Sequence, residues 1–152
     1  MSTVSTFLWF DNQAEEAAIR YTSLIKNSAV LDVARGPDGA AFMVTFQLDG
    51  QQFHALNGGP AHTFSEAASI FVSVETQSEV DELWTALTAD GGEDGPCGWL
   101  KDRYGLSWQI IPTALPQLMS DPNPAKAGAV MAAMRQMSKI CVQDLQDAYD
   151  AA

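Results

Sequence analysis

The sequence predicts an α+β fold made of two βαβββ units and a helical tail. Two helices carry N-terminal capping signals, and each follows a strand-like segment rich in β-branched and aromatic residues. The same order of elements then follows each helix. We therefore expect a single domain of 152 residues, with a first unit at about 4–60, a second at about 66–112 and a tail at about 113–152.

In the first unit, the segment Ser5–Phe10 is the first expected strand. Asn12 and Glu15 have the spacing of a capping box, and the apolar residues after them fall on one helical stripe. A Gly-Pro-Asp-Gly turn and an Asp-Gly hairpin then separate the remaining segments. The three further expected strands are Ala29–Arg35, Ala41–Leu48 and Gln51–Leu56.

The second unit repeats this order. The strand segment Ser69–Val74 precedes a second capping box at Thr76 and Glu79, and two glycines at 91 and 92 end the helix. Two more strand segments follow, Cys97–Lys101 and Leu106–Ile111. Gly50–His54 also aligns with Gly105–Gln109, and Ser5–Phe10 aligns with Ser69–Val74, which is a weak internal similarity.

The tail contains two expected helices. Asp121-Pro-Asn-Pro124 is typical of a helix start, and the helix continues over Ala125–Met137. A shorter helix is expected over Val142–Tyr149. An apolar stripe in the longer helix suits either the core or a subunit interface, which favours a homodimer. Its members are Val130, Met131, Met134 and Met137.

Charge and composition exclude several classes of partner. The net charge is −11, from 19 acidic and 8 basic residues, so phosphate backbones and anionic membrane surfaces are repelled. We expect no nucleic-acid partner and no membrane partner. The N-terminus lacks the basic and apolar regions of a signal peptide, and Cys97 and Cys141 match no metal or redox spacing. A cytoplasmic protein with reduced thiols is therefore expected.

Three stretches resemble the PhnB-like branch of the vicinal-oxygen-chelate superfamily, which includes glyoxalase I, bleomycin-resistance proteins and extradiol dioxygenases. They are Leu8–Ala18, Ala55–Pro60 and Cys97–Pro112, and the segment starting at Asp121 is similar too. The resemblance implies a curved mixed sheet with helices on its convex side. It also implies a small-molecule pocket on the concave face, commonly in a dimer.

Superfamily enzymes hold a divalent metal with side chains from the first and last strands of each unit. Carried over, these positions are Ser5, Ser69, His54 and Gln109. Only the histidine is a good metal ligand, because hydroxyl and amide groups bind divalent cations weakly. The sequence therefore predicts no metal site and no cofactor. His54 suits a pocket wall, a metal ligand or a purely structural role, and these interpretations stay open.

The predicted ligand site places His54 opposite Gln109, with aromatic walls from Phe7, Trp9 and Phe71 and the two serines Ser5 and Ser69 nearby. No catalytic residue is assigned. Cys97 lacks an evident partner that lowers a thiol pKa. The loop residue His62 is expected to be solvated, as is the turn Lys101-Asp102-Arg103.

The favoured function is metal-free binding of a small molecule. The alternatives are a metal-dependent lyase, isomerase or dioxygenase, a metal-free catalyst using His54, and an interaction protein with a vestigial pocket. Members of this branch also carry the label 3-demethylubiquinone 3-methyltransferase. The sequence does not support that chemistry, since no glycine-rich turn follows a first parallel strand and opens a helix.

Overall fold

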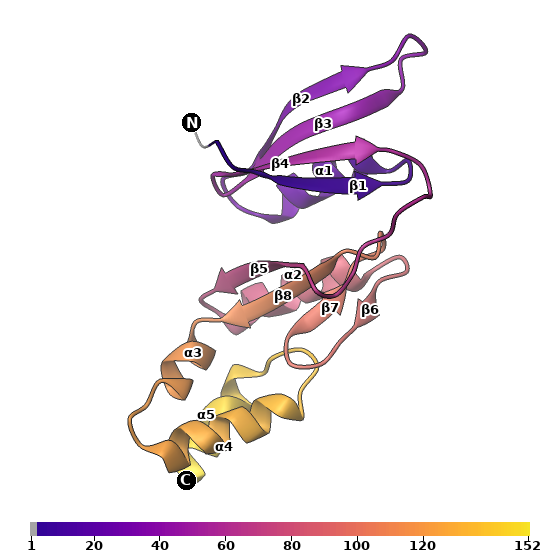
Figure 1. The fold of residues 1–152 in the computed structure, drawn as a ribbon. Coiled ribbons are helices and arrows are strands. Elements are labelled where there is room, and N and C mark those ends of the chain that lie inside the picture. Colours follow the sequence, from indigo (N-terminus) through magenta and orange to yellow (C-terminus); the bar gives the residue numbers. More distant parts are fainter. Residues whose placement is uncertain (1–2) are drawn as a thin grey trace. The chain divides into compact units, whose positions relative to one another are not determined.

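The computed structural model describes residues 3–152 and divides the chain into two compact units, 1–64 and 65–152. Each unit has its own four-stranded mixed sheet (Figure 1). The division falls in the segment between the two βαβββ units expected from the sequence. No helix among the described residues is long and apolar enough to cross a membrane.

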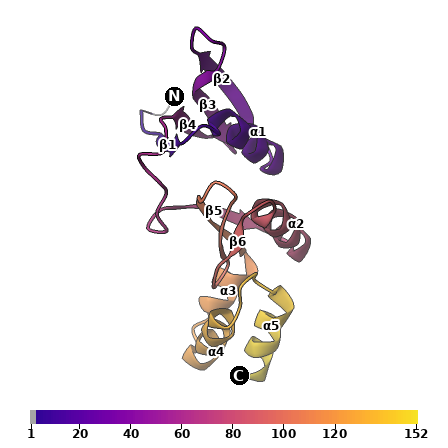
Figure 2. The ribbon, with the colours of Figure 1, turned by 90° about the vertical axis from the view of Figure 1, so that its right-hand side faces the viewer.

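The first unit consists of one helix and one sheet. The strand order is β1-β4-β3-β2, in which β1 is parallel to β4 and the other neighbours are antiparallel. The helix covers one face of the sheet (Figure 2). Buried side chains alternate along the strands, as expected for a sheet with one covered face. The elements are β1 (Thr6–Phe10), α1 (Ala14–Leu24), β2 (Ala29–Arg35), β3 (Ala41–Leu48) and β4 (Gln51–Asn57).

The start of α1 differs from the expected capping box. The helix begins at Ala14, and neither Asn12 nor Gln13 caps it with a side chain. Instead the Ala14 amide donates to Asn57 Oδ1 at 2.8 Å, and Asn57 Nδ2 donates to the Ala41 carbonyl at 3.1 Å. The asparagine of the Asn-Gly-Gly-Pro motif therefore joins the helix start to β3 and β4, and the local capping prediction is wrong.

The second unit has the same topology in its sheet. The strand order is β5-β8-β7-β6, with β5 parallel to β8. The predicted N-cap at Thr76 is confirmed, because the Glu79 amide donates to Thr76 Oγ1 at 3.1 Å. The Glu79 carboxylate returns to the cap through the Thr76 hydroxyl, which donates to Glu79 Oε1 at 3.1 Å. The elements are β5 (Ser69–Val74), α2 (Gln77–Thr88), β6 (Glu93–Asp94), β7 (Trp99–Lys101) and β8 (Ser107–Pro112).

The equivalence of the two halves is confirmed at the level of topology. In each unit the first strand pairs in parallel with the last strand, and the intervening helix packs on one face of the sheet (Figures 1 and 2). Strand β7 begins later than expected, at Trp99 and not at Cys97. The reason is that Cys97 and Gly98 have φ values of 58° and 86°, which extended backbone does not adopt.

The turn before β8 is not the solvated charged turn that the sequence suggested. Asp102 is 2% exposed, and its carboxylate accepts three hydrogen bonds. Its Oδ1 accepts from the amides of Tyr104 and Leu106 at 2.9 and 3.0 Å, and its Oδ2 accepts from Trp108 Nε1 at 2.9 Å. Asp102 therefore fixes the turn and orients the largest buried ring of this unit.

The tail forms three helices, one more than expected. They are α3 (Ala114–Met119), α4 (Pro124–Arg135) and α5 (Val142–Ala151). Asn123 caps α4 by accepting from the Ala125 amide at 2.9 Å, and Pro124 occupies the first turn, as predicted. The helices share a core with the end of β8. Its buried members are Ile111, Leu115, Val130, Ile140 and Leu145.

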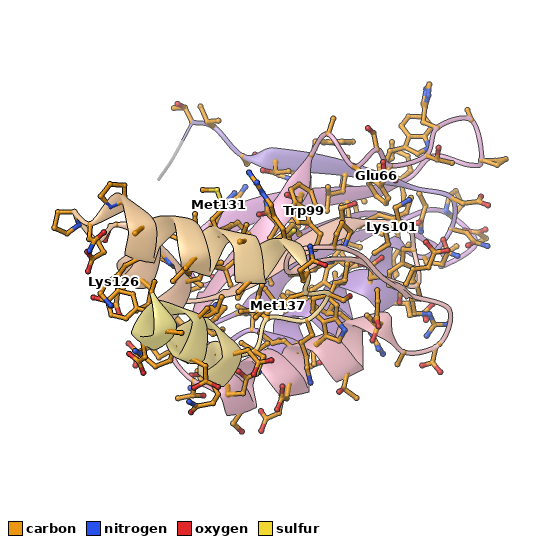
Figure 3. All side chains as sticks on the ribbon, turned by 90° about the horizontal axis from the view of Figure 1, so that it is seen from below. Glu66, Trp99, Lys101, Lys126, Met131 and Met137 are labelled. Carbon is orange, nitrogen blue, oxygen red and sulfur yellow. The ribbon has the colours of Figure 1, made fainter. Side chains whose placement is uncertain are left out.

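The methionine stripe of α4 mostly serves this core. Val130 is fully buried, and Met134 and Met137 pack against the cluster. Met131 is only partly buried and is not part of this packing (Figure 3). The stripe was expected to cover another apolar surface. Most of its side chains do so within the tail, by packing into this core.

Side chains of α2 hold the tail against the rest of the second unit. Gln77 Nε2 donates to the Ile140 carbonyl at 2.9 Å, and Gln77 Oε1 accepts from the Val142 amide at 2.7 Å. Lys139 forms an ion pair of 2.8 Å with Asp81. The hydrogen bond from Lys139, with a second from Gln77, lowers the pKa of the Asp81 carboxyl. The ion pair therefore stabilises the fold at pH values above the ordinary carboxyl pKa, and this stabilisation is lost as the pH falls through the lowered pKa of Asp81.

Candidate functional site

The face of the first sheet that α1 leaves open carries three of the seven predicted site residues, Phe7, Trp9 and His54. The register places Phe7 beside His54, His54 beside Thr45, and Thr45 beside Asp32, so one row crosses all four strands. Phe7 is 52% exposed, whereas its neighbour Leu8 faces the core. The sequence parity that grouped Phe7 with Trp9 on one face is therefore confirmed.

His54 is fixed by two hydrogen bonds on this face. Its Nδ1 lies 3.2 Å from Thr45 Oγ1, and its Nε2 lies 3.3 Å from Gln52 Nε2. The Phe7 ring is tilted against the imidazole, with 6.2 Å between centroids. Because the Gln52 amide nitrogen only donates, both bonds form together when the imidazole proton is on Nδ1, which then donates to Thr45 Oγ1 while Nε2 accepts from Gln52. Gln52 and Thr45 were not assigned from the sequence, although both share the strand parity of the histidine.

Trp9 is held by the Asn-Gly-Gly-Pro loop. Its Nε1 donates to the Gly59 carbonyl at 2.9 Å, and a Cβ atom at Gly58 would lie 2.4 Å from the indole ring. His62 packs edge-on against the indole, with centroids 4.8 Å apart. A glycine at 58 is thus required by the close approach of the ring. His62 has a ring contact that its expected role as a solvated loop residue did not include.

The open face of the second sheet carries Gln109, Ser69 and Phe71. Gln109 Nε2 donates to Ser69 Oγ at 3.0 Å, although the two residues are not directly opposite in the register. Phe71 pairs with Gln109 and is 58% exposed, and Trp99 pairs with Gln109 on the other side. Polar groups and exposed aromatic rings are therefore combined here as they are in the first unit.

The structure brings the predicted residues together in two separate sets. Phe7, Trp9 and His54 share the open face of the first unit, with Ser5 exposed just before β1. Ser69, Phe71 and Gln109 share that of the second unit. The expectation that His54 lies opposite Gln109 stays a prediction, since these residues belong to different units.

The donor set does not fit the divalent metal of the superfamily. Both nitrogens of His54 lie within hydrogen-bond distance of Thr45 and Gln52, and Gln109, whose Nε2 donates to Ser69 Oγ, offers only a neutral amide oxygen. The remaining positions offer only neutral hydroxyl groups, which hold divalent cations poorly. No three His, Cys, Asp or Glu side chains within residues 3–152 are grouped as metal ligands would be.

A pocket of about 450 Å³ lies in the second unit, and sequence reasoning missed it. Its wall includes Lys101, which forms an ion pair with Glu66, and the buried Ser107. The hydrogen bond and charge of Lys101 lower the pKa of Glu66, and Glu66 in turn raises the pKa of Lys101. The sequence held one signal for this pocket. Lys101 lies two residues after Trp99, and Ser107 two residues before Gln109, so these side chains point to the same face of the sheet as Trp99 and Gln109.

Comparison with known proteins supports the same family from sequence and from structure. A family model described as 3-demethylubiquinone-9 3-methyltransferase matches residues 2–111. The structure is similar to a PhnB protein from Bacillus cereus, itself described as a putative 3-demethylubiquinone-9 3-methyltransferase, with 32% identity and a TM-score of 0.67. That match covers 74% of this chain and 100% of the Bacillus chain. No protein with a curated description matches the sequence.

More distant structures share the fold. A protein from Pseudomonas aeruginosa is 16% identical with a TM-score of 0.60. The match covers 74% of this chain and 98% of the Pseudomonas chain. A fosfomycin resistance protein from Listeria monocytogenes, solved with Mn(II), is 17% identical with a TM-score of 0.55. The match covers 77% of this chain and 97% of the Listeria chain.

The family model ends at residue 111, and the Bacillus chain is fully covered by 74% of this one. The tail helices, and the sequence resemblance noted at Asp121, lie beyond the residues that the family model matches. The duplicated βαβββ topology, the matched family model and the Bacillus structure agree. The chain belongs to the PhnB-like branch of the vicinal-oxygen-chelate superfamily.

Proposed function

We propose that this chain binds a small molecule on its open sheet faces without a metal ion. The observation that carries the proposal is the group around His54. A hydrogen-bonded imidazole lies beside the exposed Phe7 ring, on a sheet face that α1 does not cover. A neutral polar site bordered by aromatic rings suits a ligand with a flat apolar part and a hydrogen-bonding group.

The second sheet supports this proposal independently. Gln109 and Ser69 form a hydrogen-bonded pair next to the exposed Phe71, so a similar combination of groups recurs. Neutral donors and acceptors favour a polar neutral or anionic ligand group over a bare divalent cation.

Catalysis by a metal-dependent lyase, isomerase or dioxygenase is the alternative. Elemental analysis of protein purified without a His tag separates the two, because a stoichiometric metal contradicts metal-free binding. We do not propose methyl transfer. The link between β1 and α1 is Asp11-Asn12-Gln13, which lacks the glycine-rich turn used by typical adenosylmethionine-dependent enzymes.

The first test replaces His54 with Leu. We expect the variant to lose binding of small aromatic ligands while its free energy of unfolding stays within about 1 kcal/mol of the wild type, because the side chain lies outside the core. Thermal-shift screening against small aromatic compounds and antibiotics measures both effects. Ligands should stabilise the wild type and have a smaller effect on the variant.

Gln51→Leu is the matched control, since Gln51 is an exposed polar residue on the same strand but on the opposite side. It should keep the ligand response of the wild type. Ligands that stabilise the His54→Leu variant as strongly as the wild type would show that His54 has no part in binding.

We also propose that the protein is a homodimer. Apolar side chains remain exposed on the strands of the first unit, and association would cover them. Sedimentation at micromolar concentration should give about twice the chain mass of 16.4 kDa. A species of 16.4 kDa alone would contradict the proposal. The exposed side chains outside the proposed ligand site are Leu31 and Phe42.

A further inference from the structure

The pocket of the second unit has a chemistry different from that around His54. Its volume of about 450 Å³ lies in the range of small-molecule sites. It adjoins β6, β7 and the start of β8, and the loop Gly95–Cys97 completes its wall. The side chains that matter here are Glu66, Glu93, Asp94, Trp99, Lys101 and Ser107.

The pocket is acidic. Three carboxylates and one ammonium group line it, and that ammonium group, on Lys101, is paired with Glu66. Asp94 accepts a hydrogen bond from Trp84 Nε1 at 2.9 Å, which leaves its negative charge in place. Glu93 is exposed beside Lys101, across the register from it. The excess of negative charge attracts a cation and repels an anion.

A buried hydroxyl in the pocket wall has hydrogen-bonding capacity that the protein does not use. Ser107 is 1% exposed, and its Oγ has no hydrogen-bond partner among residues 3–152. Buried polar groups in native proteins are almost always paired, because leaving one unpaired is costly. Because this oxygen is itself buried, a ligand N–H group in the pocket would supply the missing partner once neighbouring side chains shift to admit it.

The tail fixes one wall of the pocket. The amides of Cys97 and Gly98 donate to the carbonyls of Met137 and Ser138 at 2.8 Å each, and Ser138 Oγ donates to the Gly95 carbonyl at 2.6 Å. Preorganisation of this kind lowers the entropy cost of binding. Met137 and Ser138 lie beyond residues 2–111, which the family model matches, so this wall is held by residues outside the matched region.

We propose that this pocket binds a small protonated aromatic amine. The ammonium group would lie near Glu93 and Asp94 and donate to Ser107 Oγ, and the apolar ring would pack on Trp99, which is only partly buried. All residues of this site belong to the second unit, whereas His54 belongs to the first.

The test is an NMR titration of the ¹⁵N-labelled full chain with benzylamine, benzyl alcohol and phenylacetate. Benzylamine should shift the amides of residues 93–101 and 107 and the Trp99 indole. Benzyl alcohol, its neutral analogue, should bind roughly tenfold more weakly because it lacks the charge. Phenylacetate should not bind. Equal binding of benzylamine and benzyl alcohol would overturn the proposal.

Substitutions in the pocket test whether benzylamine binds there. Glu93→Gln and Ser107→Ala should each weaken benzylamine binding by about threefold or more. Asp144→Asn changes the net charge by the same amount as Glu93→Gln but lies on α5, outside the pocket, and should bind as the wild type does. Shifts of the amides of residues 93–101 and 107 are followed apart from those of β1 and β4, which carry Phe7 and His54, so this site and the proposed His54 site can fail separately. Equal losses in the Glu93 and Asp144 variants would mean non-specific attraction and would overturn the proposal.

Discussion

Replacing Asp102 with Ala is expected to lower the free energy of unfolding by about 3–4 kcal/mol. The carboxylate accepts from the amides of Tyr104 and Leu106 and from Trp108 Nε1. Its loss leaves these donors without that acceptor in the interior, and each buried unpaired donor costs on the order of 1–3 kcal/mol. Urea unfolding followed by tryptophan fluorescence measures the change.

Asp102→Asn is the control for this result. The amide oxygen can still accept from the two backbone amides, but its NH₂ group faces the Trp108 N–H and cannot accept from it. We expect about half of the loss seen with Ala. A free energy of unfolding for Asp102→Ala within about 0.5 kcal/mol of the wild type would show that water replaces the carboxylate without cost.

Replacing Gln77 with Ala is expected to cost about 2 kcal/mol and to loosen the tail. The Val142 amide would lose its acceptor, and the Ile140 carbonyl would lose a donor. Because the same tail holds the loop of the pocket, the amides of Cys97 and Gly98 should exchange with solvent faster. Hydrogen exchange measured by NMR reports on these two amides directly.

Gln143→Ala is the matched control, since Gln143 is exposed on α5 and bonds only to Asp147 in the described contacts, at 2.8 Å. It should leave both stability and exchange at residues 97 and 98 unchanged. If Gln77→Ala unfolds the tail while these amides keep their wild-type protection, the tail does not hold the loop.

The periodic elements of the fold could be predicted from sequence because their signals are local. Thr76 and Glu79 cap α2 within one turn, and the Asp49-Gly50 dipeptide closes the β3–β4 hairpin with φ values of 46° and 89°. Alternation along β1 placed Phe7 and Trp9 on one face for the same reason.

The interactions that join distant segments could not be predicted. Asn57 caps α1 from a position 43 residues away, and no local pattern distinguishes it from a turn asparagine. Asp102 looks like a surface residue in sequence because Lys101 and Arg103 flank it, yet its partners Leu106 and Trp108 bury it. The hydrogen-bond partner of such a polar residue can be identified only from the folded structure.

The candidate site likewise has a part that could be predicted from the sequence and a part that could not. Homology and strand parity selected His54, Gln109 and the aromatic residues, and the structure places them on open sheet faces. The acidic pocket was missed because its members come from four separate segments, and because the unpaired state of Ser107 depends on packing. The role of the tail in its wall required the backbone hydrogen bonds at Met137 and Ser138.

The parallel pairing within each unit also sets the order in which the chain can fold during synthesis. Strand β1 has no partner until residues 53–57 have been made, and then the first sheet is complete without any later residue. Strand β5 likewise waits for residues 107–112. The loop at residues 97 and 98 acquires its last two acceptors only when residues 137 and 138 emerge. Because domains form as units while the chain grows, the first sheet is the earliest structure to form, and the pocket is among the last.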